Sequence, residues 1–252
     1  MATFTTADRT RLHHVDRGSG EPVVVFVHGW CSNLDTWSAQ LAHYDARHRV
    51  IALDRRGHGR SDPSRTGYEV GVHAADLAEL LDHVGVGDAM VVAHAGGVPA
   101  ALHVAVDHPH LVAGLALIEA RLGPPAVGAR SGLLALVESL RGDDGPAVLE
   151  RTYRSFFIDA AGDDAVAAAT AMPIEVVADE LAGLAIDSQA LARAVTQPVW
   201  WISAEAADAG RIGSLFTSVQ VAQLTATGHF PQVESPEALH GIIDEALAAL
   251  RR

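Results

Sequence analysis

The chain has 252 residues, of which 49% are hydrophobic and 19% are charged, a balance typical of a folded domain with a substantial core. Acidic residues outnumber basic residues by 31 to 18, which gives a formal net charge of −13. Because nucleic acids and anionic membranes are bound by basic surfaces, this charge argues against both as partners. A single cysteine, Cys31, excludes a disulfide within the chain and is typical of a reducing compartment.

The first ten residues lack the basic segment and apolar run of a signal peptide,. No apolar run reaches the roughly 18 residues that a membrane span needs. We therefore expect a cytoplasmic protein. The 14 histidines are scattered, without the paired spacing beside a carboxylate that indicates zinc. We expect neither a metal nor another cofactor.

Short apolar runs alternate with helical patterns along the chain. The predicted strands are an antiparallel edge strand at 12–16 and buried strands at 22–27, 50–53, 90–93, 115–118, 199–202 and 219–224, and the clearest helices are 70–84, 98–107 and 236–250. Uninterrupted apolar runs are typical of strands that are buried on both faces of a sheet. Their alternation with helices predicts an α/β fold, with a doubly wound, mostly parallel sheet.

One connection is much longer than the others. About 80 residues separate the strand that ends at Ile118 from the strand that begins at Val199, far more than one crossover helix needs. The segment is rich in alanine-containing helical patterns. We predict a core formed by residues 1–120 and 196–252, with residues 121–195 inserted as a small helical cap. The cap is expected over the carboxyl ends of the strands, where ligands bind in open α/β sheets.

Motifs with glycine and histidine follow the predicted strand ends. They are His28-Gly29-Trp30-Cys31, Asp54-Arg55-Arg56-Gly57-His58-Gly59-Arg60-Ser61-Asp62, Ala93-His94-Ala95-Gly96-Gly97 and Thr227-Gly228-His229-Phe230-Pro231. In order and spacing they resemble the α/β-hydrolase superfamily over nearly the whole chain. The resemblance implies the α/β-hydrolase fold, with the helical cap inserted after the sixth strand. It also implies that the 54–62 segment is a structural turn.

The segment 93–97 corresponds to the nucleophile elbow, which in this family reads Gly-x-Ser-x-Gly. Here Ala95 stands in the place of the serine. A methyl group can neither attack a carbonyl carbon nor accept a proton, so the acyl-enzyme route is closed to the chain as written. The resemblance also implies an oxyanion hole formed by the backbone N–H groups of Trp30 and Gly96, and neither donor depends on the side chain at position 95.

The resemblance places His229 at the position of the general base. Two carboxylates are candidates for its partner. Asp208 follows the strand 199–202, one residue beyond the usual place of the acid. Glu119 ends the preceding strand, where haloalkane dehalogenases carry theirs. Both candidates stay open at this point.

The substrate is expected to be a small molecule, and the residues around these motifs favour an apolar or aromatic one. We expect His28, Trp30 and His94 to line its site from the core, and Phe156 and Phe157 to line it from the cap. The alternative is that these side chains have only a structural role and pack at the interface between cap and sheet.

Three functions fit this pattern. The first is an esterase or lactonase of the serine-hydrolase type that is inactive as written, because Ala95 replaces the serine nucleophile. The second is an enzyme that needs no nucleophile and uses His229 as a base, like the cofactor-independent quinolone dioxygenases of the superfamily or a lyase or cyclase. The third is a non-catalytic small-molecule binding protein.

Overall fold

The computed structural model describes residues 2–64, 67–123, 127–158 and 162–251. Within them one eight-stranded sheet has the order β1-β2-β4-β3-β5-β6-β7-β8. The strands are β1 (Ala2–Thr5), β2 (Arg11–Arg17), β3 (Val24–Val27), β4 (Val50–Leu53), β5 (Ala89–His94), β6 (Val112–Ile118), β7 (Val199–Ser203) and β8 (Val219–Gln223). β2 pairs antiparallel with both of its neighbours, β1 and β4, and all other neighbouring strands pair in parallel. The α/β class and the mostly parallel sheet are confirmed.

The true edge strand on this side is β1, which the sequence did not reveal. It pairs with β2 in the register Phe4 to Leu12, so the predicted edge strand at 12–16 is the second strand of the sheet. β1 has only one buried side chain, Phe4. A four-residue strand that is mostly exposed carries no apolar run or clear alternation, which explains why it was missed.

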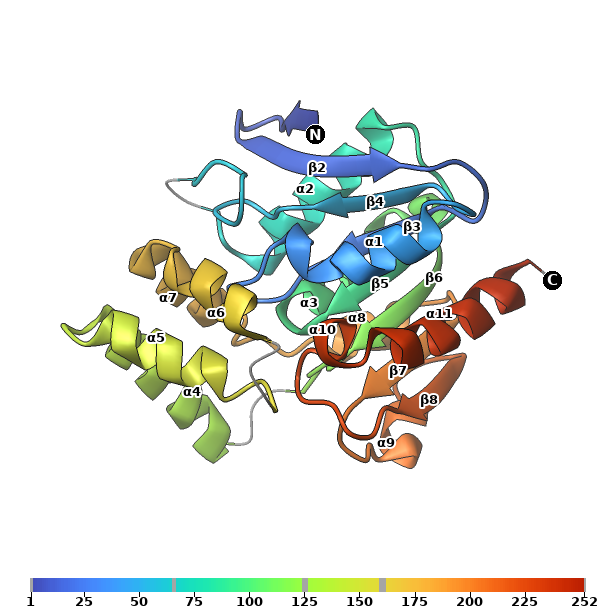
Figure 1. Ribbon diagram of the computed structural model, residues 1–252. Helices are drawn as coiled ribbons and strands as arrows, with labels where there is room; N and C mark the ends of the chain where they lie inside the picture. Colours follow the sequence, from blue (N-terminus) through green and yellow to red (C-terminus); the bar gives the residue numbers. More distant parts are fainter. Residues whose placement is uncertain (1, 65–66, 124–126, 159–161, 252) are drawn as a thin grey trace.

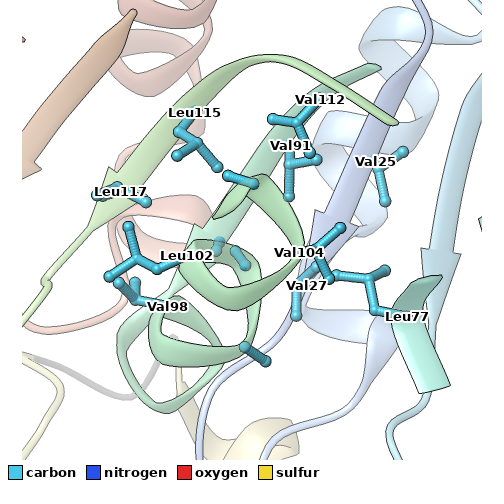
Figure 2. Packing of buried hydrophobic residues seen from close by; sticks show 14 of the residues in the cluster. Val25, Val27, Leu77, Val91, Val98, Leu102, Val104, Val112, Leu115 and Leu117 are labelled. Carbon is cyan, nitrogen blue, oxygen red and sulfur yellow. The ribbon is translucent and has the colours of Figure 1, made fainter. Parts of the chain in front are cut away.

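Helices cover both faces of the sheet (Figure 1). α2 (Val70–His83), α3 (Val98–Asp107) and α8 (Gln189–Ala194) lie on one face, and α1 (Ser38–Tyr44) and α11 (Pro236–Leu250) lie on the other. Figure 2 shows how Val98, Leu102 and Val104 of α3 pack against Val27 and Leu117 of the central strands. Each such fully buried side chain contributes about 1.5–3 kcal/mol to folding. The core therefore fixes the carboxyl ends of β3, β5 and β6 relative to one another.

The insertion after β6 forms a separate layer beyond the carboxyl ends of the strands (Figure 1). Its helices are α4 (Val127–Arg141), α5 (Gly145–Arg154), α6 (Asp163–Thr170) and α7 (Ile174–Gly183). They share a hydrophobic cluster with Trp30, Cys31 and Phe230 of the core. α8 falls within the predicted cap range 121–195, but its Ala192 packs in the cluster under the sheet. α8 therefore packs with the core cluster, whereas α4 to α7 share the cluster around Trp30.

Short helices complete the core: the 3₁₀ turns η1 (Leu34–Trp37), η2 (Ala95–Gly97) and η3 (Pro109–Leu111), and the helical turns α9 (Ala209–Gly213) and α10 (Pro231–Glu234). None of the helices in the described ranges is long and apolar enough to cross a membrane.

Candidate active site

A sharp turn at Ala95 joins β5 to α3. Ala95 has a φ of 44°, in the left-handed region that residues with a Cβ seldom adopt. The two glycines that follow are required by close packing. A Cβ on Gly96 would lie 2.9 Å from the Trp30 nitrogen, and a Cβ on Gly97 would lie 2.5 Å from the His28 carbonyl oxygen. The turn thus has the strained, tightly packed form of a nucleophile elbow, with a methyl group at its tip.

Two backbone N–H groups lie beside this turn. The Trp30 N–H donates to no backbone acceptor among the described residues. Gly96 lies in the first turn of a helical segment, where backbone N–H groups have no partner within the helix. The close approach of the Trp30 nitrogen to Gly96 brings the two predicted oxyanion-hole residues side by side.

His229 and Glu119 meet next to the elbow, although Glu119 directly follows β6 and His229 follows β8, the last strand. His229 Nδ1 lies 3.1 Å from Glu119 Oε2, and their side chains are 21% and 16% exposed. Glu119 Oε1 accepts a hydrogen bond of 2.6 Å from the Ala204 N–H. Burial alone would raise the pKa of Glu119, but the hydrogen bonds from His229 and Ala204 outweigh it and lower that pKa below its usual value. Glu119 is thus held as a carboxylate that fixes the orientation of the imidazole.

Asp208 does not pair with His229 in this structure. It is the N-cap residue of α9 and accepts a hydrogen bond of 3.0 Å from the Arg211 N–H. Together with Arg121 and Trp201, it lines a cavity of about 320 Å³. Of the two candidate partners, the structure brings Glu119 to His229. The reason is local, because the loop after β7 turns at Asp208 into a helix whose first free N–H groups take up the carboxylate.

His28 and His94, which were expected to line the substrate site, lie in the interior and are fully buried. His28 Nε2 accepts a hydrogen bond of 2.9 Å from the Arg55 N–H, and its Nδ1 lies 2.9 Å from the Gly29 carbonyl oxygen. His94 Nε2 lies 2.7 Å from the His229 carbonyl oxygen. Burial lowers the pKa of both imidazoles well below the usual value, so both are neutral. They hold the loops that carry the site.

Of the three predicted aromatic residues, Phe156 lies beside His229, whereas Phe157 and Trp30 pack against other residues. The Phe156 ring lies 4.9 Å from the His229 ring, between centroids, and the Phe156 carbonyl accepts a hydrogen bond of 2.8 Å from the His229 N–H. Phe157 instead stacks on Phe230 at 4.6 Å inside the cap cluster. Trp30 donates its indole N–H to the Val177 carbonyl of α7 at 2.9 Å. Phe156 is therefore the cap aromatic that borders the histidine.

Three residues that the sequence analysis did not place at the site also belong to its surroundings. Leu184 follows α7, and its Cδ1 would lie 3.0 Å from a Cβ on Gly96, so it borders the elbow from the cap side. Arg55 and Glu180 form a buried ion pair between core and cap, with 2.5 Å between Arg55 Nη2 and Glu180 Oε1. A charged residue on an apolar helix face was the available signal for Glu180. In the described ranges no group of three or more side chains is arranged to hold a metal ion.

A strained strand-to-helix turn, two unpaired backbone donors beside it and an adjacent histidine–carboxylate pair define the layout of an α/β-hydrolase site. The sequence profile of the family described as alpha/beta hydrolase fold matches residues 22–162. The chain belongs to this family.

Among curated proteins, the chain is similar to a non-heme chloroperoxidase of Streptomyces lividans, with 40% identity over 123 residues. That alignment covers 48% of this chain and 45% of the relative. It is also similar to the non-heme chloroperoxidase CPO-A1 of Kitasatospora aureofaciens, with 46% identity over 98 residues, or 38% of this chain and 35% of the relative. The chain thus matches less than half the length of these curated relatives.

Solved structures resemble the chain over its full length. A thermophilic esterase from Thermogutta terrifontis superposes with a TM-score of 0.88 at 24% identity, covering 100% of this chain and 99% of the other. The enol-lactonase from Burkholderia xenovorans LB400 superposes with a TM-score of 0.85 at 18% identity, covering 98% and 100%. At these identities the likeness establishes the fold.

Proposed function

We propose that this protein is built for hydrolysis of a small ester or lactone and binds such a substrate without forming an acyl-enzyme, because Ala95 stands at the nucleophile position. The observation that carries the proposal is the elbow turn. It keeps its left-handed backbone at Ala95 and its contact with Trp30, beside an assembled His229–Glu119 pair. The esterase and enol-lactonase among the structural neighbours support this substrate class.

Each remaining part has a role in that chemistry. Glu119 accepts the Nδ1 proton of His229, which leaves Nε2 as the basic nitrogen. With a serine at position 95, Nε2 would take the hydroxyl proton as the oxygen attacks the carbonyl carbon, and would then deliver it to the leaving group. The N–H groups of Trp30 and Gly96 would stabilise the negative oxygen of the tetrahedral intermediate. Phe156, beside His229, favours an apolar or aromatic group on the substrate.

The test is to compare the chain with its Ala95→Ser variant. Both are treated with a serine-directed phosphonate probe and with a panel of activated esters and lactones. We expect labelling and turnover only in Ala95→Ser, and loss of both in the matched Ala95→Ser/His229→Gln variant, which keeps the hydroxyl but lacks the base. A folded Ala95→Ser variant that neither labels nor turns over any substrate would contradict the proposal.

A second function is favoured by one specific observation: the His229–Glu119 pair is assembled although no nucleophile stands in front of it. A histidine held in this way can remove a proton from a bound heteroaromatic compound, which would then react with oxygen, or it can serve a lyase or cyclase. Oxygen uptake by the Ala95 chain with heteroaromatic substrates, abolished by His229→Gln, would support this alternative. Ligand binding without turnover in every form would favour a non-catalytic binding protein.

A further inference from the structure

The peptide group between Gly29 and Trp30, which carries the predicted oxyanion donor, is hydrogen-bonded at its carbonyl end by the charged side chain of Arg55. Gly29 C=O and Trp30 N–H belong to one planar, trans peptide group, so they point in opposite directions. Arg55 Nη2 donates a hydrogen bond of 2.8 Å to the Gly29 carbonyl oxygen, and His28 Nδ1 lies 2.9 Å from the same oxygen. Rotation of this peptide would turn the Trp30 N–H away from the elbow and break both contacts.

Arg55 is itself fixed by the cap. Its side chain is 2% exposed, and its Nη2 lies 2.5 Å from Oε1 of Glu180, a fully buried residue of α7. The second oxygen, Oε2, lies 2.8 Å from His58 Nε2. Burial alone would raise the pKa of Glu180, but the charges of Arg55 and His58 lower it far below its usual value, so the carboxylate stays charged. One guanidinium thus joins the loop after β3, the loop after β4 and the cap.

We propose that Arg55 is a positioning residue of the oxyanion hole: anchored on Glu180, it holds the Gly29 carbonyl and thereby sets the direction of the Trp30 N–H. The inference rests on the proposed function, since an oxyanion is what this donor would bind. It also makes the hole depend on the cap, because α7 must be seated for Glu180 to hold Arg55. The positive charge at the carbonyl end polarises the peptide and strengthens its N–H as a donor.

The first test needs no catalysis and uses the chain with Ala95. The backbone amide signal of Trp30 is followed by ¹H–¹⁵N NMR in the Arg55→Met and Arg56→Met variants. Arg56 is a matched control, because it is buried and paired with Asp76 at 2.6 Å but has no contact with Gly29. We expect Arg55→Met to shift the Trp30 signal and speed its hydrogen exchange, and Arg56→Met to leave both as they are. Equal behaviour of the two variants would overturn the proposal.

The second test uses the Ala95→Ser background. Removing an oxyanion-hole donor costs roughly 10²–10³ in kcat, so misdirecting one donor is expected to lower kcat by about 10- to 100-fold. KM should change little, because the donor acts on charge that develops in the transition state. Arg55→Lys keeps a donating cation and should recover part of the loss. An Arg55→Met variant with unchanged kcat would contradict the proposal.

Two further results distinguish a failure of the proposed function, or of a variant to fold, from a failure of the inference about Arg55. If Ala95→Ser shows no turnover, the proposed function fails, while the Trp30 amide still tests the role of Arg55. If Arg55→Met does not fold, because it leaves the Glu180 charge buried, the Arg55→Met/Glu180→Gln variant removes that charge. Its Trp30 signal is then expected to shift as well, and an unshifted signal would overturn the proposal.

Discussion

Removing one partner of the buried ion pair between Glu180 and Arg55 should destabilise the protein unusually strongly, and the neighbouring residue provides the comparison. Glu180 is fully buried, 2.5 Å from Arg55. Asp179, the preceding residue of α7, pairs with Arg141 at 2.8 Å, but these side chains are 54% and 48% exposed. Glu180 and Asp179 can each be replaced by alanine. The two variants lose the same kind of contact from the same helix and differ mainly in burial.

The expected free energies of unfolding differ several-fold. Glu180→Ala leaves the Arg55 guanidinium buried without its counter-charge, which should destabilise the protein by about 3–5 kcal/mol. Asp179→Ala loses an exposed pair, which should cost about 0–1 kcal/mol. Salt should distinguish them as well. Raising NaCl weakens the exposed pair but screens the buried pair much less.

Urea unfolding followed by circular dichroism, at low and at high salt, measures both effects. Glu180→Gln serves as a control, because it keeps an oxygen acceptor for Arg55 and removes only the charge, so it should fall between the parent chain and Glu180→Ala. If Glu180→Ala and Asp179→Ala destabilised the chain equally, burial would not be the deciding factor and the reasoning would be wrong.

Three further predictions concern the site. In the Ala95→Ser background, Glu119→Gln should lower kcat by about 10²-fold or more. Asp208→Asn should stay within about twofold of the parent, because the Asp208 carboxylate caps the start of α9 and does not pair with His229. Ester kinetics measure both. The pKa of Glu119 is lower in the folded protein than its usual value, so the ionised carboxylate stabilises the fold. This contribution is complete above the unfolded-state pKa of about 4.3. It is lost as the pH falls through the lower pKa of the folded state. The urea midpoints of the chain and of Glu119→Gln should therefore converge on acidification, and a constant difference down to pH 2 would contradict the assignment. Gly97→Ala should destabilise the chain by about 1–3 kcal/mol, because its Cβ would lie 2.5 Å from the His28 carbonyl oxygen; an unchanged thermal midpoint would refute that contact.

The sheet was predictable where the strands are buried on both faces. β3, β4 and β6 are uninterrupted apolar runs, and their side chains are almost entirely buried. β1 was not predictable, because its short, exposed sequence carries no such run. The predicted cap range 121–195 included α8 because this helix lies between β6 and β7 in sequence, whereas Ala192 of α8 packs in the core cluster.

The site was predictable in its motifs but not in its pairings. Sequence spacing located Ala95, Trp30 and His229 at strand ends, since parallel strands bring their carboxyl ends to one edge of the sheet. It left Asp208 and Glu119 open, because that choice depends on the path of a loop and on which backbone N–H groups are free to take up a carboxylate. The contact between Arg55 and Glu180 depends on how α7 is seated, and no local pattern encodes it.

The elbow shows which part of a catalytic turn depends on the nucleophile and which does not. A left-handed backbone costs a residue with a Cβ about 1–2 kcal/mol, and Ala95 keeps this conformation without a hydroxyl to display. The conformation must therefore be imposed by its surroundings, above all by the close approach of Gly96 to Trp30 and of Gly97 to His28. A serine at position 95 adds one hydroxyl to the existing methyl carbon and demands no change in the backbone. The turn should present that oxygen beside His229 as soon as it is introduced, so restoring activity requires one substitution and no rebuilding of the loop.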